Sequence, residues 1–147
     1  SNSASTILKF QVTDPFEYNQ YVNLLTDLDF NPSSELFGIT DVTLTGRATN
    51  AETKLYVKAA WLHNEQFPIT GLSATNFKLT LNGSDIPVDG AVTYDSTTKE
   101  YGIPPDSSIT TGQSWIVTLY DAGNNVACAQ LGNKFYRGNT GAFVVTV

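Results

Sequence analysis

The stretch GLSATNFKLTLNG, residues 71–83, decides the fold class of this chain. In an extended backbone its apolar side chains Phe77, Leu79 and Leu81 point to one face and the polar side chains between them point to the other, which is the period of a half-buried strand. The following Asn82-Gly83 pair tolerates positive φ angles and is typical of a tight hairpin turn. The stretch therefore predicts a β-strand followed by a turn.

Composition extends this prediction to the whole chain. The 147 residues suit one domain of 39–147 preceded by an N-terminal segment of 1–38. The chain is rich in β-branched, aromatic and turn-forming residues, so we expect an all-β fold. A net charge of −6, with 8 Lys and Arg, leaves no basic surface for nucleic acid or for anionic membranes, and no apolar run is long enough to span a bilayer.

Eight short alternating segments follow one another, separated by Asn, Asp, Gly, Pro and Ser clusters. Because no helical segments alternate with them, they predict an antiparallel β-sandwich or small barrel instead of a parallel sheet. The segments are 41–49, 53–62, 77–82, 90–95, 99–104, 114–121, 124–131 and 142–147.

The N-terminal segment has a different pattern. Residues 7–13, ILKFQVT, predict a first strand. Asp14 as the N-cap, Pro15 at the first helical position and Glu17 behind them predict one short helix over residues 15–25. Residues 1–5 have the composition of a linker or cloning scar and are excluded from fold reasoning.

The order of the motifs from Trp61 onward resembles the Ig-like (fibronectin III-like) modules of bacterial surface and secreted proteins. The sequence has a GL…F lead-in to a strand that ends in NG, a following apolar strand, and WIVTLYDAGNN, in which a strand ends in Asp before a Gly-Asn turn. The resemblance covers residues 41–147 and implies an Ig-like antiparallel sandwich. The first 38 residues match no Ig strand.

Catalytic and metal-binding constellations are poorly supported by the residue types. His63 is the only histidine and Cys128 the only cysteine, which excludes a four-coordinate zinc site; we expect His63 in an exposed loop and Cys128 buried. Asp27, Asp29 and Asn31 have the opening spacing of a calcium loop, but the required glycine and closing glutamate are missing downstream. We therefore expect no metal, no cofactor and no enzyme activity.

The resemblance also raises an isopeptide crosslink, since many such surface domains join a lysine of the first strand to an asparagine near the last. Lys9 and Asn139 have the right order along the chain. An exposed lysine that protects a strand edge is the simpler interpretation.

Aromatic residues supply the remaining candidates for a binding site, because exposed rings on a sheet can stack against sugars. Trp115 alternates with Val117 and is expected in the core, whereas Tyr56 and Tyr120 fall on the opposite faces of their strands. Residues 135–139, FYRGN, are expected to form a loop that either presents Tyr136 and Arg137 to a ligand or anchors them by packing. The candidate ligand-binding residues are Tyr56, Tyr120, Tyr136 and Arg137.

Three functions fit these features. The first is a non-catalytic Ig-like spacer or adhesion module of a bacterial surface or secreted protein, with neighbouring domains and a glycan or surface protein as partners. The second is a carbohydrate-binding module of a secreted glycan-degrading enzyme, and the third is a phage virion decoration or tail module. The first is favoured, with an extracellular or cell-surface location.

Overall fold

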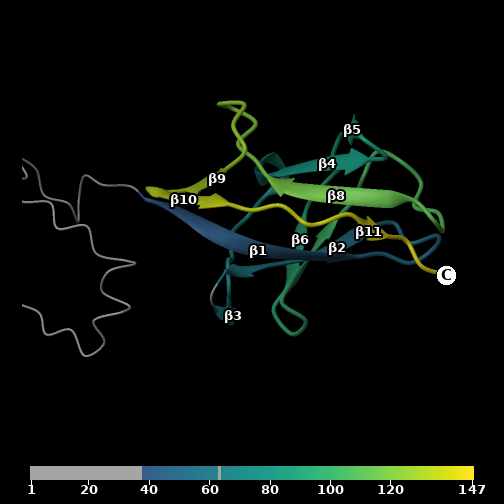
Figure 1. The fold of residues 1–147 in the computed structure, drawn as a ribbon, viewed down its shortest axis with the longest axis horizontal. Coiled ribbons are helices and arrows are strands. Elements are labelled where there is room, and N and C mark those ends of the chain that lie inside the picture. The colour runs from purple at the N-terminus through teal and green to yellow at the C-terminus, as the bar shows by residue number, and fades with distance from the viewer. Residues whose placement is uncertain (1–37, 63) are drawn as a thin grey trace, which may run out of the picture. The chain divides into compact units, whose positions relative to one another are not determined.

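The computed structural model describes residues 38–62 and 64–147, which form two β-sheets stacked face to face (Figure 1). The predicted all-β class and sandwich architecture are confirmed. The predicted strand at 7–13, the helix at 15–25, the calcium-loop spacing from Asp27, Lys9 and His63 lie outside the described residues. The packing of the N-terminal segment on the domain stays a prediction.

The larger sheet contains seven strands. In spatial order these are β6 (Thr93–Asp95), β7 (Glu100–Ile103), β2 (Leu55–Trp61), β1 (Ile39–Arg47), β10 (Lys134–Arg137) and β9 (Ala129–Leu131), with β3 (Asn64–Pro68) paired to β2 beside this order. All of these strands pair antiparallel except β1 and β10, which run parallel.

The smaller sheet contains four antiparallel strands, one of which lies in the stretch of residues 71–83. In spatial order they are β11 (Phe143–Val144), β8 (Ser114–Leu119), β4 (Phe77–Leu81) and β5 (Ser84–Ile86). A single 3₁₀ turn, η1 (Ala74–Asn76), precedes β4. The turn predicted at Asn82 and Gly83 is confirmed, because both have the positive φ angles, 49° and 88°, of a two-residue hairpin.

The core lies between the sheets, where the apolar positions of both alternating patterns meet. Trp115 is fully buried, as its alternation with Val117 predicts, and its indole Nε1 donates to Oε1 of Gln113 at 3.2 Å. Tyr101 of β7 is also buried, and its hydroxyl donates to the carbonyl oxygen of Ile69 at 2.7 Å. Buried aromatic side chains with a satisfied polar end are a large share of what holds such a core together.

One edge of the sandwich is closed by the pairing of β1 with the C-terminal part of the chain. The start of β1 pairs with β10, and Thr49 just beyond its end forms a parallel bridge with Thr146. Between these points the C-terminal segment crosses to β8, with bridges from Asn139 and from β11. Gly138 lies at the crossing, where a Cβ would overlap the backbone of Val42. This seam joins the two sheets.

The strand predictions differ from the structure in three places. Each predicted segment overlaps an observed strand, but β3, β5 and β10 lie outside all of them. The prediction of a loop at 135–139 is wrong, because Phe135, Tyr136 and Arg137 pair with β1 on one side, and β10 pairs with β9 on the other. β1 is distant in sequence, so local composition does not reveal that pairing, whereas β9 and β10 are joined by the short Gly132-Asn133 connection.

The segment 124–131 is extended only at its end. The carboxylate of Asp121 accepts hydrogen bonds from the backbone N–H groups of Gly123 and Asn124 at 2.9 and 3.2 Å. These bonds fold residues 121–126 into a turn, and only Ala129–Leu131 form strand β9.

No helix in the described part of the chain is long and apolar enough to span a bilayer.

Candidate functional site

The hairpin formed by β2 and β3 carries an exposed apolar cluster that we call the hairpin surface, made of Trp61, Leu62 and Phe67. Their exposed fractions are 50%, 48% and 58%. The rings of Trp61 and Phe67 lie with their centroids 6.0 Å apart and their planes tilted by 40°. The two rings are therefore held together in water, with Leu62 exposed beside Trp61 in the chain, and apolar surface left in water contributes no burial to the stability of the fold.

Trp61 is the last residue of β2, and the pattern of that strand is regular up to it. Leu55, Val57 and Ala59 are buried in alternation, and the pairing of β2 with β1 stays in register as far as Trp61 and Val42. The irregularity lies in β3, where residues 65–67 are extra between the partners of Trp61 and Ala60. Such irregularities bend a strand and change the direction of the side chains beside them.

Strand β3 adds polar groups next to the rings. Asn64, Glu65 and Gln66 are all exposed. The backbone N–H of Gln66 donates to Oδ1 of Asn64 at 3.2 Å, which fixes the Asn64 side chain at the start of the strand. The ammonium of Lys99 lies 3.4 Å from the backbone oxygen of Gln66. Between Leu62 and Phe67, the chain therefore carries two exposed side-chain amides and one exposed carboxylate.

A second candidate is a cleft of about 450 Å³ beside β4, on the smaller sheet. It is lined by Tyr120, by Lys78 and by Asp85, whose carboxylate lies 2.8 Å from the Lys78 ammonium. The hydrogen bond to Asp85 raises the pKa of Lys78. The Lys78 ammonium also lies 5.7 Å from the centre of the Tyr120 ring, and the Tyr120 hydroxyl is hydrogen-bonded to Asn125.

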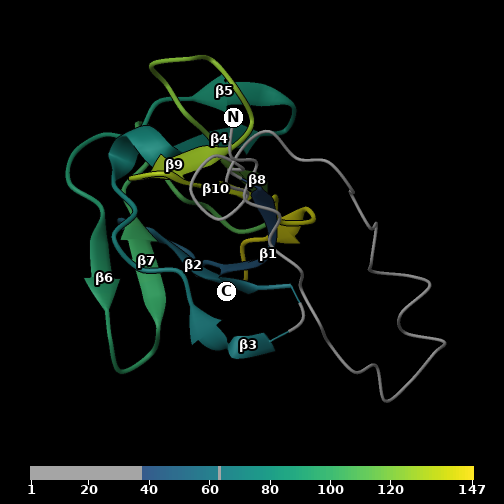
Figure 2. The same ribbon diagram turned by 90° about the vertical axis from the view of Figure 1, so that its left-hand side faces the viewer.

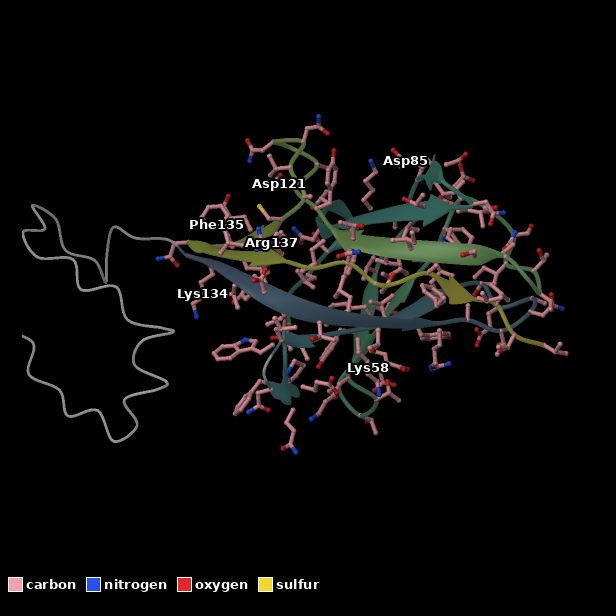
Figure 3. The ribbon with its side chains drawn as sticks, in the orientation of Figure 1. Lys58, Asp85, Asp121, Lys134, Phe135 and Arg137 are labelled. Atoms are coloured by element: carbon pink, nitrogen blue, oxygen red, sulfur yellow. The ribbon has the colours of Figure 1, made fainter. Side chains whose placement is uncertain are left out.

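The cleft therefore has its polar groups already paired. Figure 3 shows Asp85 and Asp121 on the same side of the smaller sheet, toward its two ends. The Asp121 carboxylate binds Asn124, and these hydrogen bonds lower its pKa. A ligand in this cleft would have to compete with existing ion pairs and hydrogen bonds.

Tyr56, another predicted site residue, belongs to the other side of the molecule. It lies between the buried Leu55 and Val57 on β2, so its ring points outward from the larger sheet. The guanidinium of Arg47 covers the ring at 4.5 Å from its centre. Figure 3 places Lys58, which shares this face, opposite Asp85. Tyr56 and Tyr120 therefore lie on outer faces of different sheets and do not form one platform.

The same Arg47 forms the best-defined ion pair of the larger sheet. Its Nη2 and Nε atoms donate to the two carboxylate oxygens of Glu100 at 2.7 and 3.0 Å. The Glu100 side chain is nearly buried, and the hydrogen bonds from Arg47 lower its pKa against the opposing effect of burial. This pair holds strands together and leaves Tyr56 partly covered.

Tyr136 and Arg137 are brought together by β10 but face different environments. Tyr136 is 9% exposed and belongs to the core cluster. Arg137 is exposed and pairs with Asp41, with its Nη2 2.9 Å from Oδ1 of that carboxylate. Figure 3 shows Arg137 with Lys134 and Phe135 at the end of the sandwich where β1 begins. Core packing thus holds Tyr136, and the ion pair with Asp41 engages the exposed Arg137, whose role in ligand binding stays a prediction.

Residues 38–62 and 64–147 contain no group of three or more His, Cys, Asp or Glu side chains that could hold a metal ion. A hollow of about 840 Å³ among the loops includes the carboxylates of Glu52, Asp89 and Asp106.

Cys128 is free and only partly buried, so the prediction that it is buried is wrong.

The hairpin surface was missed by the sequence analysis for an identifiable reason. The sequence analysis selected aromatic residues opposite the core-facing positions of their strands, Tyr56 and Tyr120, and expected an exposed loop at His63. A signal was present, because NEQFP has one large apolar residue among polar neighbours, which is the composition of an exposed strand.

A scan of the chain against protein-family models and a search of curated proteins both find no match. The function is therefore argued from the arrangement of the sandwich itself.

Proposed function

We propose that residues 38–147 are a non-catalytic Ig-like module that serves as a structural spacer or adhesion domain in a bacterial surface or secreted protein. The strand order supports the Ig-like assignment. With β3 and the β9–β10 hairpin set aside as additions, the order β6-β7-β2-β1 faces the order β5-β4-β8-β11. Named along the chain, these are the strands D-E-B-A and C′-C-F-G of an Ig domain.

The observation that carries the spacer function is the position of the first strand and of the C-terminal strands of the described domain. Figure 1 places the start of β1 at one end of the sandwich and the C-terminus at the other. The pairings agree, because Ile39 is the partner of Phe135 whereas Thr146 is the partner of Thr49. About ten residues of extended strand, or about 33 Å, separate these points. A domain with its ends so placed extends a chain of modules by its own length.

The same pairings determine how the module would respond to tension. Tension between residues 38 and 147 runs along β1 and the C-terminal strands, which are parallel where they meet. Their hydrogen bonds run across the direction of the force, so several are loaded in shear and must break together. A spacer at a cell surface needs this resistance to pulling.

Single-molecule force spectroscopy tests the proposal. Pulling the protein between residues 38 and 147 should require a markedly higher force than pulling between residues 38 and 133, which peels β10 from β1 one pair at a time. A Cys128→Ser background allows attachment at introduced cysteines. Equal forces in the two directions would contradict a tension-bearing spacer.

The cellular setting is part of the same proposal. Flanking Ig-like domains in the full-length gene product would support a bacterial surface or secreted protein and a location outside the cell. A flanking glycan-degrading catalytic domain would instead favour a carbohydrate-binding module, and tail-fibre segments would favour a phage virion module.

A further inference from the structure

We propose that the hairpin surface is a binding site for a neutral glycan chain, with sugar rings packed on Trp61 and Phe67. The inference goes beyond the spacer function and does not depend on it, since a mechanically weak domain could still bind a glycan at this hairpin. Three features of the hairpin carry it: a strand that the core does not use, the size of the apolar cluster, and the polar groups around it.

Strand β3 contributes nothing buried to the sandwich. Four of its five residues are exposed and Pro68 is only partly buried. Both Figure 1 and Figure 2 show β3 on the side of the larger sheet away from β4 and β5. A strand that packs against no second layer gains little from an exposed Phe67, so folding alone does not explain the ring.

The size of the apolar cluster indicates the kind of ligand. With about 150–250 Å² for each large side chain, the exposed fractions of Trp61, Leu62 and Phe67 correspond to roughly 300 Å² of accessible surface. A stable protein interface needs about 800 Å² from each partner, with an apolar centre of matching extent. The hairpin surface is too small for that, but it matches the footprint of a few sugar rings.

The groups around the cluster match sugar chemistry. The C–H face of a pyranose packs on an aromatic ring, and its hydroxyl groups need both donors and acceptors at the rim. Asn64 and Gln66 carry amides that offer both, and the Glu65 carboxylate accepts from hydroxyl groups. At the hairpin the Glu65 carboxylate is offset by the ammonium of Lys99, which lies 3.4 Å from the Gln66 backbone oxygen, so no surplus of either sign favours a charged chain and the proposal specifies a neutral glycan.

The test is a binding assay of the full chain on crystalline cellulose, chitin, starch, xylan and mixed-linkage β-glucan, followed by titration with soluble oligosaccharides of any polysaccharide that retains it. Trp115 is fully buried, so a change of tryptophan fluorescence on binding should come from Trp61. We expect saturable binding to at least one polysaccharide.

Matched variants identify the surface. Trp61→Ala and Phe67→Ala should each weaken binding by about tenfold or more, Trp61→Phe should retain most of it, and Gln66→Ala should have a smaller effect. Tyr120→Ala, on the outer face of the smaller sheet, and Tyr56→Ala, on the larger sheet away from the hairpin rings, should bind like the wild type. Unchanged thermal melting of the variants shows that the losses are not due to unfolding.

Three results would overturn the proposal. They are absence of wild-type binding to every polysaccharide tested, binding that survives both ring deletions, and self-association in sedimentation velocity that disappears in Trp61→Ala. The last result would assign the surface to a second copy of the chain.

Discussion

The two tryptophans of this protein stand at the ends of two strands and have opposite environments. Trp115 is the second residue of β8 and has no exposed surface, whereas Trp61 ends β2 and is half exposed. Trp115 points toward the larger sheet, and its cross-strand neighbours Phe143 and Leu81 belong to the smaller sheet, as Trp115 does. The main aromatic neighbour of Trp61 is Phe67, which is itself exposed. Burial therefore depends on whether a second layer covers the strand and not on the residue type.

The two tryptophans therefore differ in what they contribute to stability: Trp115 is packed between the sheets, whereas Trp61 lies on the surface. A large side chain between the sheets contributes packing and burial on all sides, so its removal leaves a cavity. A side chain on the β2–β3 hairpin loses less when removed, because water already covers half of it. Four substitutions test whether loss of stability follows burial, beginning with the fully buried Trp115.

Trp115→Ala should lower the free energy of unfolding by about 3–5 kcal/mol, because it empties a large site at the centre of the core. Urea titration followed by far-UV circular dichroism measures the change. A loss below about 1 kcal/mol would mean that the space between the sheets is not tightly packed at this residue.

Gly138→Ala should cost about 1–3 kcal/mol, because the new Cβ would overlap the backbone of Val42 where the C-terminal segment crosses between the sheets. Backbone cannot move aside as a flexible side chain can. Gly141→Ala is the matched control, since a Cβ there meets nothing within 4 Å. Equal thermal stability of the two variants would show that the seam is not a close approach.

Glu100→Gln tests a nearly buried charge on the outer face of the larger sheet and should cost about 1 kcal/mol at neutral pH, since Arg47 is half exposed. Arg47 lowers the pKa of Glu100 below its ordinary 4.5. The contribution of the pair is therefore complete above pH 4.5 and is lost as the pH falls through the lowered pKa.

Urea titrations at pH 7 and at pH 3 check this dependence. The wild type should lose its advantage over Glu100→Gln at the lower pH. A difference between the two proteins that grows on acidification would contradict the assigned direction of the pKa shift.

Trp61→Ala should change the free energy of unfolding by only about 0.5–1 kcal/mol, the cost of a partly exposed contact with Phe67. In the wild type, acrylamide should quench one tryptophan readily and the other hardly at all. The accessible fraction should disappear in Trp61→Ala. Two equally protected tryptophans would remove the distinction between the two regions.

The sequence alone determined the class of the fold and the burial of several side chains. Alternation in residues 77–81 and 114–119 predicts β4 and β8 and the burial of Trp115, because a strand of period two that is covered on one face must turn its apolar side chains to that face. The Asn82-Gly83 turn follows equally from local chemistry, since both residues tolerate positive φ angles.

The tertiary structure decided what depends on partners distant in the chain. The pairing of β10 with β1 joins Tyr136 to Thr40, which are far apart in the chain, and Trp61 is half exposed although its pairing with Val42 keeps β2 regular. A local pattern of side chains does not determine which distant strands pair, or how far the second sheet extends over the first. Local chemistry selects the elements, and only their packing determines which rings remain in water.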